Sequence, residues 1–263
     1  MTPFQPEPAA ATLHEIRQRR GQVTPLPAAI APRTEAEGAA VQLALAHRFG
    51  ASAPGGFKIG ATARRMQEYL GLSGPAAGFM ATGNILRSGA TVRFADYVRP
   101  GVECELAVRL ARDLPPGPCT AEQAADAVGD VVAGIEIVEN RYGELQELGV
   151  PTLIADQIFH GACVLGEPDA RDWRSLDIDR LRGRLVIDGH QRDEGVGADL
   201  MGHPMNCLAW LAGSTVAAAF GGLKAGQVVM LGSVTPPVWL TGPASVTLDL
   251  VLSVPEPDIR FTF

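Results

Sequence analysis

The sequence contains only four cysteines in 263 residues, and no two of them form a CxxC pair. A thiolate metal site and a redox-active dithiol are therefore not expected. Three of the four lie in apolar stretches, which favours reduced and buried thiols. Reduced thiols are typical of the cytoplasm, and we expect that location.

Long apolar segments are missing as well. No run of 18 apolar residues occurs, so no membrane span is expected. The first 20 residues lack the apolar core of a signal peptide, so export is not expected. The net charge of −7 argues against a nucleic acid as partner.

Several short motifs with known chemistry are also absent. The chain has no GxGxxG after a strand, no GxxxxGK followed by Ser or Thr, no HExxH and no GxSxG. Nucleotide binding and a serine-hydrolase elbow therefore lack their signatures. The function must come from another arrangement of side chains.

The N-terminal part of the chain has a helical pattern. Residues 9–20 combine Ala, Leu, Ile and Arg at mixed spacing. Thr34 and Glu37 have the spacing of a capping box, which predicts a second helix to about His47. We therefore expect residues 1–55 to form an N-terminal helical segment.

The remaining residues, 56–263, are expected to form a catalytic β-roll domain. Asp188 and Gly189 are typical of a hairpin turn. Helices and strands do not alternate regularly, which predicts an α+β fold with a mixed or antiparallel sheet rolled around its own core. Strand-like runs occur at 57–59, 91–94, 102–110, 131–138, 162–165, 184–187, 228–231 and 245–252, and helices are expected at 120–128 and 204–220.

Three glutamates interrupt two of these apolar runs. Glu103 and Glu105 stand two residues apart and therefore point to the same face of a strand. Glu136 has apolar neighbours on both faces, where an unpaired carboxylate would lose its hydration. One interpretation is an exposed edge strand with solvated acids. The other is a site for a divalent cation, and the lack of nearby Cys or His ligands favours Mg²⁺ or Mn²⁺ over Zn²⁺.

Lys58 is a second candidate, in the segment Gly55-Gly56-Phe57-Lys58-Ile59-Gly60. The flanking glycines permit close approach of a ligand or of backbone. Lys58 is either a surface lysine at the end of a strand or a cation that holds a substrate carboxylate or transfers a proton.

Two further segments carry polar side chains at the ends of apolar runs. Asp156 and His160 could both reach a cleft, and histidine readily exchanges protons near neutral pH, although a structural histidine is the common alternative. Gly232, Ser233 and Thr235 follow a strand. They form either an ordinary loop or a turn whose amides and hydroxyls face an anion.

Taken together, these segments resemble the fumarylacetoacetate hydrolase superfamily, in its branch of 2-keto-4-pentenoate hydratases and 4-oxalocrotonate decarboxylases. The resemblance spans nearly the whole chain. Its motifs are FKIGAT at 57–62, GVECELAVRL at 101–110, GIEIVENRY at 134–142, LIADQIFHGACVLG at 153–166, GHPMN at 202–206 and VVMLGSVTPP at 228–237.

The resemblance implies a rolled mixed sheet and a homo-oligomer that binds a small 2-keto acid. It implies Mg²⁺ (or Mn²⁺) on Glu103, Glu105 and Glu136. It assigns the family lysine to Lys58, and substrate contacts to the turn of Gly232, Ser233 and Thr235. Lys58 would then hold or protonate the enolate, with His160 or Asp156 as the candidate base.

The chain departs from the branch in two places. The segment 78–82 lacks the acidic residue common in hydratases of this branch. His160 stands where the branch often has serine, and Gln157 where it often has asparagine. These positions handle substrate and protons, so the departures concern the reaction and leave the predicted metal ligands intact.

The function implied by the resemblance is a metal-dependent lyase that adds water to a 2-hydroxy-dienoate or 2-oxo-alkenoate in the catabolism of aromatic compounds. One alternative is a 2-oxo-3-hexenedioate-type decarboxylase, or a C–C bond hydrolase or tautomerase of the same superfamily. A further alternative is a non-catalytic, metal-stabilised partner subunit.

Overall fold

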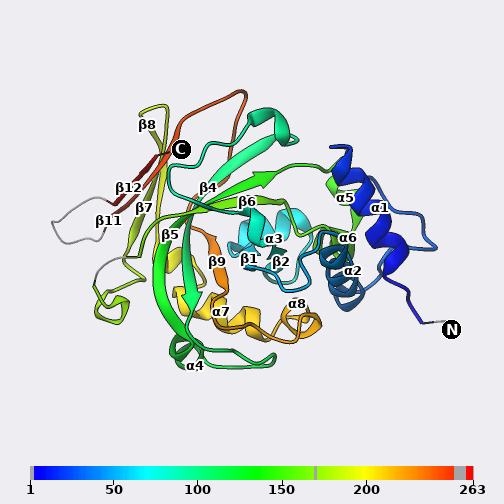
Figure 1. Cartoon of the computed structure of the whole chain (residues 1–263), viewed down its shortest axis with the longest axis horizontal. Helices are drawn as coiled ribbons and strands as arrows, with labels where there is room; N and C mark the ends of the chain where they lie inside the picture. Colours follow the sequence, from blue (N-terminus) through cyan, green and yellow to red (C-terminus); the bar gives the residue numbers. More distant parts are fainter. Residues whose placement is uncertain (1–2, 169–170, 252–258, 263) are drawn as a thin grey trace.

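The computed structural model describes residues 3–168, 171–251 and 259–262. Two helices, α1 (Glu7–Gln18) and α2 (Glu35–Arg48), lead into the sheets, as the sequence predicts. Thr34 caps α2, because its hydroxyl accepts a hydrogen bond of 3.1 Å from the amide of Glu37. Figure 1 shows both helices at one end of the molecule, together with the N-terminus.

The main sheet is mixed and follows the order β2-β1-β9-β4-β5-β6-β3, with β10 paired to β4. Among its described strands, the β1–β9 and β3–β6 pairs are parallel and the other pairs are antiparallel. Its strands are β1 (Gly56–Gly60), β2 (Ala76–Met80), β3 (Ile85–Arg87), β4 (Pro100–Leu110), β5 (Val128–Glu139), β6 (His160–Leu165), β9 (Val228–Ser233) and β10 (Val238–Trp239). The long strands β4 and β5 curve around the interior (Figure 1). The α+β class with a rolled mixed sheet is thus confirmed.

A smaller antiparallel sheet packs on the outer face of β4 and β5. Its order is β12-β11-β7-β8, with bounds β7 (Arg182–Ile187), β8 (His190–Val196), β11 (Val246–Val251) and β12 (Ile259–Thr262). Val102 and Cys104 of β4 pack against Leu185 and Leu248 of this sheet. The predicted hairpin at Asp188–Gly189 joins β7 to β8, and both residues have positive φ, at 52° and 77°.

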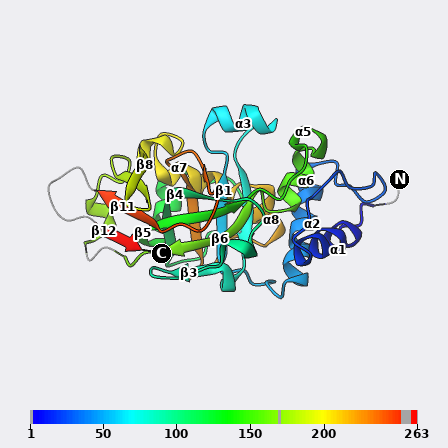
Figure 2. The same cartoon turned by 90° about the horizontal axis from the view of Figure 1, so that it is seen from above.

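Helices cover a further part of the same face of the main sheet, because Leu106 and Val108 of β4 continue the row of Val102 and Cys104. The largest core cluster joins the sheet to α4 (Ala121–Asp126), α7 (Pro204–Ala212) and α8 (Thr215–Ala219). The remaining helices are α3 (Arg64–Leu70), α5 (Leu145–Leu148) and α6 (Val150–Ala155). Figure 2 shows α3 standing out from the body of the molecule. Among the described residues, no helix has the length and apolar character needed to cross a bilayer.

Buried Gln42 ties the helical segment to the sheets. Its amide nitrogen donates to the carbonyls of Ile154 (2.6 Å) and Ala77 (3.1 Å), and its oxygen accepts from the amide of Phe79 (2.9 Å). Gly38 lies so close to α6 that a Cβ would come within 2.5 Å of the Pro151 oxygen. The helical segment thus packs tightly on the roll, and the predicted boundary at residue 55 stays a prediction.

Three sequence predictions need correction or restriction. The strand predicted at 91–94 is wrong, because 91–93 form a loop and Phe94–Asp96 a 3₁₀ turn. The helix predicted at 204–220 is two helices, since Ser214 caps α8 by accepting from the amide of Ala217. Of the strand predicted at 245–252, β11 covers Val246–Val251, and residue 252 lies outside the described residues.

Candidate metal centre and adjoining cavities

Glu103, Glu105 and Glu136 converge on one point. Glu103 faces Glu136 directly in the β4–β5 register, and Glu105 lies two residues further along the same face of β4. One carboxylate oxygen from each residue lies within 4.8 Å of the others. Within the described part of the chain, these three acids form the one group of potential ligands that is close enough together to hold a metal ion.

Burial of these acids makes their mutual repulsion strong. Burial, reinforced by the charge of Glu136, raises the pKa of Glu103 to about 8. Burial and the two neighbouring carboxylates raise the pKa of Glu105 well above its ordinary value. A cation between the three oxygens would offset both effects, because an opposite charge favours the ionised carboxylate.

The partners of these acids leave room for such a cation. Oε2 of Glu105 accepts from the amide of Gly232 at 3.1 Å. Oε1 of Glu136 lies 2.8 Å from Nδ1 of His160 and 3.6 Å from Nζ of Lys58, whereas its buried Oε2 has no partner within the described part of the chain. An all-oxygen set with an orphaned carboxylate oxygen fits a hard divalent ion.

Lys58 and His160 also set the charge of Glu136. Burial alone would raise the pKa of Glu136, but Lys58 and His160 hold it below its ordinary value. Burial lowers the pKa of His160 against the opposing charge of Glu136, which favours the neutral ring. A neutral ring that donates its Nδ1–H to Glu136 fixes the orientation of that carboxylate.

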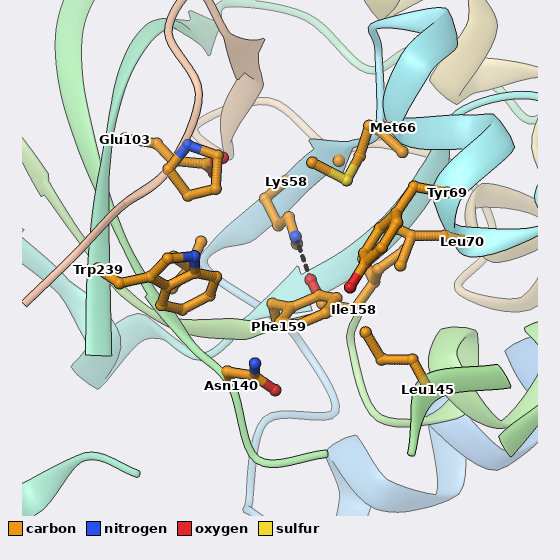
Figure 3. A pocket seen from close by; sticks show the side chains of 14 residues that line it. Lys58, Met66, Tyr69, Leu70, Glu103, Asn140, Leu145, Ile158, Phe159 and Trp239 are labelled. Atoms are coloured by element: carbon orange, nitrogen blue, oxygen red, sulfur yellow. Dashed lines mark hydrogen bonds between the residues drawn. The ribbon is translucent and has the colours of Figure 1, made fainter. Parts of the chain in front are cut away.

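Lys58 lies between the acids and a cavity. It lies on β1, 2% exposed, and its ammonium donates to the carbonyl of Ile158 (Figure 3). Gly60 makes this path possible, because a Cβ there would lie 3.0 Å from Nζ of Lys58. The ammonium is thus held between a carboxylate and a carbonyl at the floor of the cavity.

The carbonyl that holds Lys58 belongs to an unusual turn. Gln157, Ile158 and Phe159 all have positive φ, at 61°, 38° and 67°. Such conformations cost about 1–3 kcal/mol each for residues other than glycine and persist only where neighbours enforce them. Here the hydroxyl of Tyr142 accepts from the Phe159 amide at 3.1 Å, and Gln157 donates to the Phe79 carbonyl at 2.5 Å.

Asp156 precedes this turn and is fully buried. Its two carboxylate oxygens bind Arg17 from α1 and Arg141 from the loop after β5, at 2.7 and 3.0 Å. Burial alone would raise the pKa of Asp156, but Arg141 and Arg17 hold it below its ordinary value. Both guanidinium groups also donate to the Asp156 carbonyl, at 3.1 Å from Arg141 and 2.6 Å from Arg17.

Two cavities meet at Glu103. The first cavity has a volume of about 270 Å³ and is lined by Lys58, Glu103, Asn140 and mainly apolar side chains. Figure 3 shows Trp239 and Phe159 on one side of it and Tyr69, Leu70 and Leu145 on the other. The second cavity, of about 600 Å³, shares Glu103 with the first and is lined by residues including Arg65, Asp199, Ser233 and Thr235.

The turn predicted to contact substrate borders the second cavity. The hydroxyl of Ser233 lies 3.1 Å from the Cys104 carbonyl, and that of Thr235 accepts from the Cys104 amide at 3.2 Å. Gly232 has φ of 117°, and a Cβ would lie 2.6 Å from Cγ2 of Thr62. Because the Gly232 amide already donates to Glu105, this glycine supports a candidate metal ligand.

The sequence candidates therefore fall into three groups. Lys58 and Glu103 line the first cavity, and Glu105 and Glu136 converge with Glu103 beside it. His160 contacts Glu136 and does not line the cavity. Asp156 is held by arginines and does not line it either, so its position favours a structural role over that of a base. Leu145 and Trp239 carry no chemical motif, and sequence reasoning missed them.

A rolled mixed sheet with a three-carboxylate centre beside a cavity defines a protein suited to bind a divalent ion together with a small organic ligand. Residues 58–250 match the family model described as "Fumarylacetoacetate (FAA) hydrolase C-terminal". The chain belongs to the fumarylacetoacetate hydrolase family.

Named relatives lie in one branch of that family. The chain is 32% identical to the 2-hydroxyhexa-2,4-dienoate hydratase of Comamonas testosteroni over 184 residues, 69% of this chain and 68% of that protein. It is 30% identical to the 2-keto-4-pentenoate hydratase of Paraburkholderia xenovorans (strain LB400) over 245 residues, 90% and 88% of the two chains.

A solved structure has the same fold over nearly the full length. It is the 4-oxalocrotonate decarboxylase from Pseudomonas putida G7, complexed with magnesium and adipate. The TM-score is 0.84 with 22% sequence identity, and 95% of each chain is covered. This similarity supports the fold alone.

Proposed function

We propose that the protein is a divalent-metal-dependent hydratase that adds water to a 2-hydroxy-dienoate or its 2-oxo-alkenoate tautomer in the catabolism of aromatic compounds. The observation that carries the proposal is the convergence of Glu103, Glu105 and Glu136 next to Lys58, with Glu103 and Lys58 lining the first cavity. The two hydratase relatives support the same reaction type.

We propose Mg²⁺, or Mn²⁺ in its place, as the ion held by the three glutamates. The all-oxygen ligand set favours such hard ions. When bound, the ion would supply Lewis-acid stabilisation of negative charge on the 2-oxygen of the substrate. His160 keeps Glu136 in its orientation, and the Gly232 amide does the same for Glu105.

Lys58 is the proposed proton-handling group, since its ammonium lines the first cavity. In the reaction the dienol loses its hydroxyl proton and gains a proton at C5, which gives the conjugated 2-oxo-3-alkenoate. The hydroxyl of water then joins C4 and its proton joins C3. Lys58 would stabilise the enolate oxygen in both steps and return a proton to the carbon skeleton.

The reaction is tested with two substrates. The purified protein with Mg²⁺ is incubated with 2-hydroxypenta-2,4-dienoate and, separately, with 2-oxo-3-hexenedioate, and absorbance and CO₂ are followed. We expect loss of the dienoate absorbance with formation of 4-hydroxy-2-oxopentanoate. Release of CO₂ from the dioate without hydration of the dienoate would show that the enzyme is a decarboxylase and not a hydratase. Cleavage of a substrate into two smaller carbon-containing products would indicate a hydrolase.

The metal ligands are tested by calorimetry on chelator-treated protein. We expect one Mg²⁺ or Mn²⁺ per chain, and loss of that binding in Glu136→Gln. Glu147→Gln is the matched control, because Glu147 is exposed and lies outside the carboxylate centre. Equal binding in wild type and Glu136→Gln would remove the assignment. Metal binding without turnover of any substrate would favour a non-catalytic partner subunit.

The proposal also covers the oligomeric state and the cellular location. We infer a homo-oligomer and a cytoplasmic location from the family resemblance. Light scattering on the purified protein tests the first, because a monomer of 27.7 kDa would contradict it. Fractionation of the source cells tests the second.

A further inference from the structure

The two cavities that meet at Glu103 differ in their polar groups. Among the described lining residues, the second cavity has one guanidinium, that of Arg65, and two carboxylates, those of Glu103 and Asp199. Its hydroxyls are those of Thr62, Tyr69, Ser233 and Thr235. The first cavity has Lys58 at its floor, and its remaining wall is apolar except for Glu103, Asn140 and the Tyr69 hydroxyl. A 2-oxo acid bound at Glu103 would therefore meet different chemistry at its two ends.

We propose that the first cavity receives the carbon tail of the substrate and selects an uncharged, apolar tail over one that ends in a carboxylate. The inference rests on the proposed function and names the substrate class within it: monocarboxylic 2-hydroxy-dienoates. The carboxylate head would then lie toward the second cavity, near the Thr235 hydroxyl and the guanidinium of Arg65 and away from Asp199.

The charge balance of the first cavity is the first argument for selection of an uncharged tail. Lys58 is its single cation among the described lining residues, and this ammonium already lies 3.6 Å from Glu136 and donates to the Ile158 carbonyl. A second carboxylate at the far end would meet no positive charge from the described lining residues. An unpaired carboxylate loses hydration on burial, and that loss opposes binding.

The nearby arginines do not change this balance. Arg64 pairs with Glu68 on the exposed side of α3, at 3.1 Å. Arg141 is buried between Glu139 and Asp156. Each of these two guanidinium groups is thus engaged outside the first cavity.

Arg99 is also directed elsewhere. Its guanidinium donates to the backbone carbonyls of Asn140 and Tyr142 and lies 3.4 Å from Oδ1 of Asn140. This contact turns the amide oxygen of Asn140 toward Arg99. The neutral Nδ2 of Asn140 remains for the cavity, and an amide donor neutralises no carboxylate charge.

The apolar wall of the first cavity is the second argument for selection of an apolar tail. It includes the rings of Phe159 and Trp239, whose centroids lie 6.4 Å apart. Outside the wall, buried Tyr142 meets Phe159 edge to face, with ring centroids 4.6 Å apart. Tyr69 and Trp239 are 59% and 43% exposed, and both line the first cavity. A bound apolar tail would cover part of this surface, which favours binding through the hydrophobic effect.

The test compares two ligands with the same six-carbon chain, 2-oxohexanoate and 2-oxohexanedioate. Their dissociation constants are measured by calorimetry on Mg²⁺-loaded protein, so the readout does not depend on turnover. We expect 2-oxohexanoate to bind at least tenfold more tightly. Turnover of 2-hydroxyhexa-2,4-dienoate should exceed that of the matching dienedioate by a similar factor.

A designed cation provides the second measurement. Leu145→Arg places a positive charge in the wall of the first cavity, and we expect it to reduce the preference at least tenfold by strengthening binding of the dioate. Gln146→Arg is the matched control, since Gln146 is the exposed neighbour in α5 and does not line the cavity. It should leave the preference unchanged.

The possible failures are distinguishable. Equal or tighter binding of the dioate by the wild type would overturn the tail selectivity and leave the proposed hydratase in place. Binding of neither ligand to metal-loaded protein would overturn the proposed function itself. An equal change in preference in Leu145→Arg and Gln146→Arg would assign the effect to overall charge and reject the first cavity as the tail site.

Discussion

Nε of Arg17 lies 2.7 Å from Oδ1 of Asp156, although the two residues are 139 positions apart in the sequence. Arg17 belongs to α1, and Asp156 directly precedes the turn whose Ile158 carbonyl accepts from Lys58. The N-terminal helix is therefore connected through one ion pair and one turn to the ammonium at the first cavity.

Arg17→Ala should destabilise the protein and lower its turnover. Removing one partner from a buried ion pair costs about 3 kcal/mol or more, and the turn at 157–159 would lose one of its supports. Chemical denaturation measures the first effect and kcat the second. Arg17→Lys should restore part of each. Arg19→Ala is the control, because Arg19 is exposed and its side chain donates to the Glu15 carbonyl in α1. Equal stability of Arg17→Ala and Arg19→Ala would contradict the expectation.

Asp156 should make an acid-sensitive contribution to stability. Its folded pKa is depressed below the unfolded value of about 3.9, so its contribution is full above that pH and is lost as the pH falls through the folded pKa. We expect Asp156→Asn to be less stable than wild type at pH 7 and the difference to shrink below about pH 4. Urea denaturation of both proteins at several pH values measures it. A constant difference down to pH 3 would refute the depressed pKa.

Lys58→Met should separate turnover from metal binding. Loss of a proton-transferring group typically lowers the rate by about 10²–10⁴-fold. Metal affinity should stay equal or increase, because the change removes a positive charge 3.6 Å from Glu136. Steady-state kinetics and calorimetry provide the two numbers. If turnover were retained, another group would have to handle the proton.

Gly101→Ala should weaken binding of an apolar tail. Gly101 pairs with Trp239 across β4 and β10, and a Cβ at Gly101 would lie 2.8 Å from Cε3 of Trp239. The displaced indole should reduce the affinity for 2-oxohexanoate roughly tenfold, which corresponds to about 1.4 kcal/mol. Gly242→Ala, where a Cβ meets nothing within 4 Å, should leave the affinity unchanged. A normal affinity in Gly101→Ala would exclude Trp239 from the tail site.

Strands with continuous apolar runs were predictable from the sequence. β4, β5, β6 and β9 all occur where these runs predict them, because burial on both faces leaves a clear signal. β2 was missed. It contains Gly78, which is required because a Cβ there would lie 2.9 Å from the Gln157 oxygen, and glycine weakens a strand pattern.

The chemistry of the site was predictable in part, for a physical reason. Glu103 and Glu136 stand out because acids are costly in apolar strands, and that argument needs only local sequence. The pairing of Asp156 with Arg17 depends on packing between distant segments, so no local pattern reveals it. The same holds for Trp239, whose place in the first cavity follows from its pairing with β4.

α3 contributes side chains to the first cavity without contributing a buried residue to the core. None of its residues is buried, yet Met66, Tyr69 and Leu70 form part of the first cavity. Substitutions at exposed positions usually change the free energy of unfolding by no more than about 0.5 kcal/mol. Selectivity can therefore evolve at the exposed position Tyr69 while the carboxylate centre and the core remain untouched, which makes this position of α3 suitable for a library of altered substrate ranges.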